Sequence, residues 1–156
     1  MKLCDFIAKS AIVRDLKSAD RKGAIVELVE ALKNAHRSEK IKVAEVVDSL
    51  MKREKIGSTG IGNSIAIPHV KIEGLKSVIG AFGRSAGGID FNAVDGEPVH
   101  IIFLILGPFD DPEANLQVLR QISHATKQPN FCKFLRDAKD TSEIYNLFKE
   151  FDEVLK

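Results

Sequence analysis

The sequence predicts an α/β fold, a three-layer sandwich in which helices cover both faces of a mixed β-sheet. Amphipathic helical segments both precede and follow a group of short apolar segments, an order that favours this architecture. The longest apolar segment, VHIIFLIL at 99–106, is typical of a central strand covered on both faces. Because the 156 residues contain no linker-like, repeated or low-complexity segment, a single domain is expected over 1–156.

The first predicted elements are a strand and two helices. Residues 11–17 alternate apolar and polar side chains, as a half-buried strand does. Asp20 is placed to cap a helix through 24–35, and the spacing of valine and leucine predicts a second amphipathic helix over 40–54. Gly57 and the glycines after it end this second helix.

Three short strands and three helices complete the predicted fold around the central strand. The short strands are expected near residues 64–67, 78–83 and 87–91. The helices are expected over residues 110–127, 130–138 and 141–154.

The helix after the central strand has a clear start signal. Asp111 is at a capping position and Pro112 is in the first turn, where a missing N–H costs nothing. Leu116, Leu119 and Ile122 share one helical face, which predicts that they pack toward the core.

Composition excludes several classes of function. Lys and Arg number 23 and Asp and Glu 22, for a net charge of +1, and the charges alternate, so no nucleic-acid partner is expected. The wholly apolar run at 101–106 is too short to span a bilayer, so no membrane insertion is expected. Cys4 and Cys132 have neither disulfide-framework nor metal-ligand spacing, which is consistent with a cytoplasmic location and with no bound metal.

The segment GSTGIGNSIAIPHV at 57–70 invites comparison with nucleotide-binding loops, but both common motifs fail. The phosphate-binding loop of nucleoside triphosphatases requires a lysine that this segment lacks. The dinucleotide fingerprint requires a third glycine where Ile65 stands. The sequence therefore predicts no nucleotide site here.

The same segment delivers one histidine in a predictable direction. Pro68 stiffens the chain, so His69 is expected at the C-terminal end of a short strand, near the hydroxyl groups of Ser58 and Thr59. A neutral imidazole is a good nucleophile, and phosphoryl transfer needs mainly positioning and donors, to which Arg53 can contribute. On these residues alone, a structural histidine explains the pattern equally well.

Residues 53–71, REKIGSTGIGNSIAIPHVK, resemble the phosphorylation-site region of the type-2 enzyme IIA domains of the bacterial phosphoenolpyruvate-dependent phosphotransferase system. The segment is most similar to the nitrogen-regulatory branch of this fructose, mannitol and nitrogen-regulatory family. The resemblance continues through residues 91–108 and 135–148, so it covers nearly the whole chain. It implies the same three-layer α/β fold.

The resemblance also implies a phosphocarrier function. His69 would accept a phosphoryl group from the phosphocarrier protein HPr or a paralogue, with Arg53 as the nearby basic residue. Ser58, Thr59 and Gly60 are the predicted phosphate-binding residues, from their hydroxyl and backbone N–H groups. The resemblance further implies no metal and no diffusible cofactor. Downstream, either a regulatory target protein or an enzyme IIB component is expected.

Two residues depart from the family pattern at the site. Val70 stands where a small residue usually follows the histidine, and it is expected to crowd the partner's approach. Asn115 stands where many members carry a second histidine, and it is expected to point inward toward His69. These departures keep open a regulatory binding module that is not phosphorylated. A free-standing fructose- or mannitol-specific IIA component is the other alternative. In either phosphocarrier, His69 is expected in a shallow, exposed, largely apolar depression.

Overall fold

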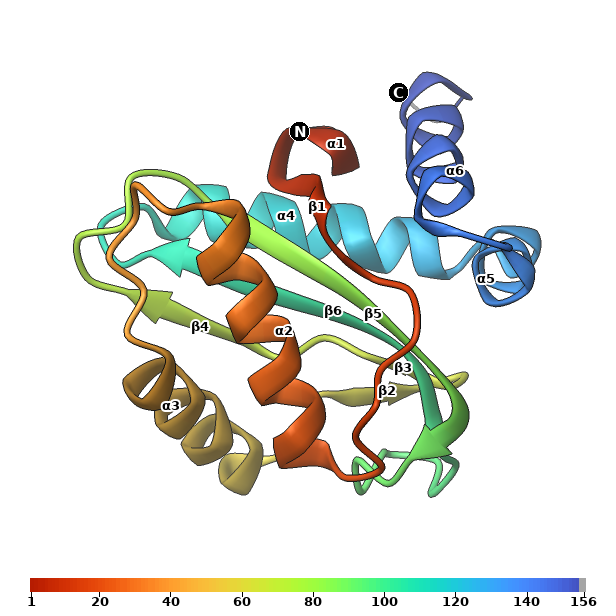
Figure 1. The fold of residues 1–156 in the computed structure, drawn as a ribbon, viewed down its shortest axis with the longest axis horizontal. Coiled ribbons are helices and arrows are strands. Elements are labelled where there is room, and N and C mark those ends of the chain that lie inside the picture. The colour runs from red at the N-terminus through yellow and green to blue at the C-terminus, as the bar shows by residue number, and fades with distance from the viewer. Residues whose placement is uncertain (155–156) are drawn as a thin grey trace.

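A six-stranded mixed sheet lies between two helical layers in the computed structural model, as the sequence predicts (Figure 1). The structure describes residues 1–154, apart from the side chain of residue 129. The strands are β1 (Ile7–Val13), β2 (Gly60–Gly62), β3 (Ile65–Ala66), β4 (His69–Ile72), β5 (Ile79–Ile89) and β6 (Val99–Pro108). The helices are α1 (Leu3–Phe6), α2 (Arg21–Ala35), α3 (Val43–Ile56), α4 (Pro112–Thr126), α5 (Pro129–Asp137) and α6 (Thr141–Val154).

The strands follow the order β1-β5-β6-β3-β2, and β4 also pairs with β6. β5 and β6 are antiparallel, whereas β1 runs parallel to β5, and both β3 and β4 run parallel to β6. β6 is therefore paired along both edges, with β5 on one side and with β3 and then β4 on the other.

The apolar sequence of β6 is explained by burial of both faces of the sheet. Ile101, Phe103 and Ile105 pack into one hydrophobic cluster with residues of α1, α4, α5 and α6. The residues between them pack into a second cluster with α2 and α3. Because successive side chains of a strand point to opposite faces, a strand between two helical layers needs apolar residues at nearly every position.

Side-chain caps fix where two of the predicted helices begin. The carboxylate of Asp20 accepts a hydrogen bond from the N–H of Gly23 at 2.7 Å, and that of Asp111 accepts from Ala114 at 3.1 Å. Pro112 is in the first turn of α4, as predicted. The start of α4 therefore has a fixed position relative to the end of β6, and this position shapes the candidate site described below.

The N-terminal prediction was wrong in position. The predicted strand at 11–17 shares only residues 11–13 with β1, because the chain turns away at the exposed Arg14 and Asp15. The one-turn helix α1 was not predicted. Its N–H groups at Leu3 and Cys4 donate to the carboxylate of Asp152 on α6 at 2.7 and 3.0 Å, a contact across the whole chain that no local pattern reports.

Two further predictions need correction. The strands predicted at 78–83 and 87–91 are parts of one long strand, β5, whose pairing with β6 is irregular between Arg84 and Ile89. On α4, Ile122 is buried as predicted, but Leu116 is 42% exposed. The helix is rotated so that its first buried residue is Asn115, which leaves Leu116 at the surface.

Candidate functional site

His69 is the first residue of β4, rather than the last residue of the preceding strand as predicted. β3 and β4 follow the same edge of β6 and are separated by Ile67 and Pro68. Proline has no N–H to donate to the ladder, but its carbonyl still accepts from the N–H of Ile105 at 2.9 Å. The strand therefore resumes after the interruption, with His69 held beside Ile105.

One nitrogen of the His69 ring has a fixed partner. Nδ1 lies 2.7 Å from the carbonyl oxygen of Ile67. Because a carbonyl oxygen only accepts hydrogen bonds, Nδ1 must carry the proton. The neutral ring then has its lone pair on Nε2, which is the nucleophilic position.

His69 lies on an open hollow of about 320 Å³ between β4, β6 and the first turns of α4. The histidine is half-buried, and Ile105, Leu116 and Leu119 supply much of the apolar lining. Among the described residues that line the hollow, Lys71 is the one with a charged side chain, a cation. This is the shallow, largely apolar surround that was expected for a histidine approached by another protein.

A larger hollow, of about 630 Å³, lies elsewhere, with Lys127, Lys133 and Arg136 among its lining residues. Its thiol, from Cys132, is a poor nucleophile because burial raises the pKa of that group. His69, in the smaller hollow, is a better nucleophile than Cys132 in the larger one. The smaller hollow is therefore the candidate site.

Asn115 points into the hollow from the first turn of α4, as predicted, and only 9% of its surface is exposed. Its Nδ2 donates to the carbonyl oxygen of Pro108 at 3.0 Å. Its Oδ1 is buried and has no hydrogen-bond partner within the described part of the chain. The site therefore contains one unused acceptor at the position where the resemblance led us to expect a second histidine.

Val70 does not crowd the site as expected. Its neighbours His69 and Lys71 share the α4 side of β4, because side chains alternate along a strand. The Val70 side chain packs instead with the hydrophobic cluster on the α2 and α3 side. Although Val70 borders the hollow, its β-branched side chain is directed away from an approaching partner.

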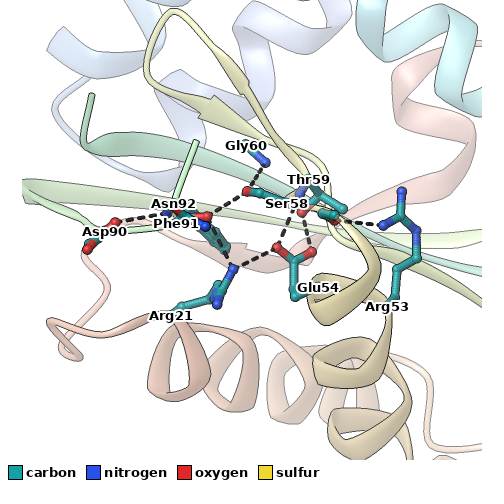
Figure 2. A network of polar contacts seen from close by, with 10 residues as sticks. Arg21, Arg53, Glu54, Ser58, Thr59, Gly60, Asp90, Phe91 and Asn92 are labelled. Atoms are coloured by element: carbon teal, nitrogen blue, oxygen red, sulfur yellow. Dashed lines mark hydrogen bonds and ion pairs between the residues drawn. The ribbon is translucent and has the colours of Figure 1, made fainter. Parts of the chain in front are cut away.

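The predicted phosphate-binding donors are already used within the protein (Figure 2). The N–H and hydroxyl groups of Thr59 donate to the carboxylate of Glu54 at 3.1 and 2.5 Å, and Thr59 is only 4% exposed. The hydroxyl of Ser58 donates to the carbonyl of Phe91 at 2.5 Å, and the N–H of Gly60 donates to the Ser58 oxygen at 2.9 Å. This geometry favours a scaffold role for the three residues over the direct phosphate binding that was predicted.

Arg53 lies in the last turn of α3, beside this loop (Figure 2). Its Nη1 donates to the carbonyl of Gly57 at 2.8 Å. A guanidinium has five N–H donors, so most of them are not used by this bond. The loop that Arg53 contacts is bonded in turn to the histidine segment, because the N–H of Ile67 donates to the carbonyl of Thr59 at 3.0 Å.

Sequence reasoning missed two charged residues of this region. Lys71 is two residues after His69 and therefore on the same face of β4, which only recognition of that strand reveals. Glu54 lies in the charged run 52–55, which is typical of a solvated helix end, yet it is buried on the same face of α3 as Val47 and Leu50. The helical spacing of these three residues was the available signal.

Within residues 1–154, no three His, Cys, Asp or Glu side chains come together as metal ligands do. No helix in the described part of the chain combines the length and the apolar character needed to cross a membrane.

Residues 5–151 match the family model described as "Phosphoenolpyruvate-dependent sugar phosphotransferase system, EIIA 2". The chain belongs to this family. This EIIA domain is therefore a phosphotransferase component, and the predicted phosphocarrier role fits its membership.

Two curated relatives and one solved structure show where this EIIA domain lies in the family. The nitrogen regulatory protein of Bradyrhizobium diazoefficiens is 34% identical over 147 residues, which are 94% of each chain. The fructose-specific EIIABC component of Bacillus subtilis is 29% identical over 152 residues, 97% of this chain but 24% of that protein. The crystal structure of IIA-Ntr from Neisseria meningitidis superposes with a TM-score of 0.84 at 31% identity, covering 92% of this chain and 97% of the other.

Proposed function

We propose that this EIIA domain is a phosphohistidine carrier that accepts a phosphoryl group on Nε2 of His69. The observation that carries the proposal is the hydrogen bond from Nδ1 to the Ile67 carbonyl, which leaves Nε2 as the nucleophile beside an open hollow. The donor is a phosphohistidine on an HPr-like protein. Its P–N bond breaks as the bond from phosphorus to Nε2 forms, and the electron pair of the broken bond returns to the donor imidazole.

The surroundings of His69 suit this reaction. Once the donor has docked, the apolar lining helps to exclude water, and the cation of Lys71 opposes the negative charge of the phosphoryl group. The phosphorylated ring is electron-poor, and the Ile67 carbonyl stabilises it by accepting a hydrogen bond from the proton on Nδ1. Arg53 is the proposed second cation. Asn115 is proposed to contact the docked donor or the phosphoryl group through the second N–H of its Nδ2, since the first N–H donates to the Pro108 carbonyl and the oxygen is buried.

Incubation with phosphoenolpyruvate, enzyme I and an HPr-like protein tests this proposal. We expect the mass of one phosphoryl group to be added, in an acid-labile linkage, and to be absent from His69→Ala. His124→Gln is the matched control, since His124 is an exposed histidine on α4 outside the hollow. A wild-type protein that gains no mass with HPr or with its paralogues excludes the phosphocarrier function for this chain.

The downstream partner is proposed to be a regulatory target, in line with the similarity to nitrogen regulatory proteins. Phosphorylation adds about 1.5 to 2 negative charges to a largely apolar face, which changes what can dock there. His69→Asp mimics part of this change. A target whose binding differs between wild type and His69→Asp supports regulation. Phosphoryl transfer from this domain to an enzyme IIB protein supports the sugar-specific alternative instead.

A further inference from the structure

Glu54 is a buried carboxylate that the proposed reaction does not use. Only 4% of the residue is exposed, on the last turns of α3. A buried carboxylate is costly unless it is paired and hydrogen-bonded. Three donors converge on Glu54: the N–H of Thr59 at 3.1 Å, the hydroxyl of Thr59 at 2.5 Å and Nη1 of Arg21 at 3.4 Å (Figure 2).

The same contacts tie the loop to two other elements. Arg21, the first residue of α2, also donates to the carbonyl of Phe91 at 3.2 Å, and its guanidinium lies 5.8 Å from the centre of the Phe91 ring. Ser58 donates to that same carbonyl oxygen at 2.5 Å. The segment from Ser58 to Gly60 is thus held between α2, α3 and the chain just after β5, as Figure 2 shows.

Thr59 connects this network to His69. Its donors are bonded to Glu54, while its carbonyl oxygen accepts from the N–H of Ile67 at 3.0 Å. The carbonyl of Ile67 in turn accepts from Nδ1 of His69 at 2.7 Å. Ile67 sets the tautomer of His69. Ile67 is therefore held by Thr59, and Thr59 is held by Glu54.

We propose that Glu54 is a positioning residue for His69, acting through Thr59 and Ile67. Its carboxylate fixes the loop, the loop fixes the peptide groups around Ile67, and the Ile67 carbonyl keeps the proton on Nδ1 so that Nε2 stays nucleophilic. This role rests on the proposed function, in which Nε2 is the phosphoryl acceptor.

Substitutions at two positions separate a charge requirement from a geometric one. Glu54→Gln keeps one acceptor for the N–H of Thr59, and its amide can donate to the Thr59 hydroxyl, so the loop geometry is retained. Glu54→Ala removes both bonds between Glu54 and Thr59, Thr59→Val removes the hydroxyl bond and leaves the backbone N–H bond, and Thr59→Ser keeps both. Glu45→Ala is the matched control, an exposed glutamate on the same helix.

Nitrogen-15 NMR of the imidazoles reports the His69 tautomer directly, in unphosphorylated protein under alkaline conditions where the ring is neutral. Wild type, Glu54→Gln, Thr59→Ser and Glu45→Ala should show the Nδ1–H form. Glu54→Ala and Thr59→Val should show a mixture with the Nε2–H form. Phosphorylation of these two variants should slow about 10- to 100-fold, as for small misplacements of a reacting group.

The tautomer measurement keeps the two proposals separable. If folded Glu54→Ala and Thr59→Val retain the pure Nδ1–H form, Glu54 does not position His69, whatever their phosphorylation rates. If Glu54→Ala does not fold, Thr59→Val decides, because it replaces a hydroxyl by a methyl group of similar shape. A shifted tautomer in these variants together with an unphosphorylated wild type upholds the positioning role and rejects only the phosphocarrier function.

Discussion

The carboxamide of Asn115 occupies the space that a side chain at Gly107 would need. The two residues belong to different elements, the first turn of α4 and the end of β6, and both line the hollow beside His69. The absence of a side chain at Gly107 therefore allows the amide to approach the sheet and to bond the Pro108 carbonyl.

Gly107→Ala is expected to destabilise the protein by about 1 to 3 kcal/mol, the usual cost of overpacking a filled site. The new methyl group would overlap the Asn115 carboxamide and displace the start of α4. Urea denaturation of the single variants and of Gly107→Ala with Asn115→Ala measures the coupling. The double variant should lose less stability than the sum of the two single variants. If the stability losses of the two single variants simply add up in the double variant, the new methyl group does not clash with Asn115.

Asn115→His is expected to change the pH dependence of phosphorylation more than it changes stability. An imidazole with an ordinary pKa of about 6.5 is charged below that pH and would then attract the phosphoryl group. The rate of phosphorylation and the lifetime of phosphohistidine should therefore rise, relative to wild type, as pH falls through about 6.5. Both are measured by the mass of the protein over time. Identical pH profiles for wild type and Asn115→His would mean that residue 115 has no part in phosphoryl transfer.

Arg53→Ala is expected to slow phosphorylation of His69 about 100-fold, the typical effect of removing one charge-stabilising donor. The bond from Arg53 to Gly57 also caps the end of α3, so a stability loss of about 1 kcal/mol is expected as well. Arg53→Lys keeps the charge and should recover part of the rate. A rate equal to that of wild type, in a variant with the expected stability loss, would assign Arg53 to the helix end alone.

Cys4 is expected to make stability depend on alkaline pH. Burial, a hydrogen bond to Asp152 and the charge of Asp152 together raise the pKa of the Cys4 thiol from 9.0 to about 11. A group whose pKa is raised by folding stabilises the protein fully below its unfolded pKa and loses this contribution as pH rises through the folded one. Relative to Cys4→Ala, the wild type should lose stability between about pH 9 and pH 11. Thermal unfolding curves at several pH values would show this loss, and a constant difference between the two proteins would contradict it.

Local patterns predicted the layers of the fold because each depends on residues close in sequence. The apolar run of β6 and the caps at Asp20 and Asp111 are signals of this kind. Such local signals do not reveal that β4 begins after Pro68. The residues His69–Ile72 form a strand because they pair with β6, which is distant in sequence. The sequence therefore predicted that the strand near 64–67 ends at His69, whereas His69 begins β4.

The candidate site could also be predicted only where it depends on local geometry. The direction of Asn115 follows from helix geometry, and the structure agrees with it. The roles of Ser58 and Thr59 depend on Glu54 and Phe91, whose positions are set by tertiary packing. A hydroxyl group in a glycine-rich loop looks free in the sequence until the carboxylate or carbonyl that binds it is known.

Asp152 binds the N–H groups of Leu3 and Cys4, and this contact sets the order in which the protein can mature on the ribosome. Leu3 leaves the ribosome before Asp152, which is 149 positions further along the chain. Until α6 has emerged, the buried side chains of Leu3 and Phe6 lack the helix that α1 packs against. The residues of α1 therefore reach their native packing only after α6 has been synthesised, although they precede it in the chain.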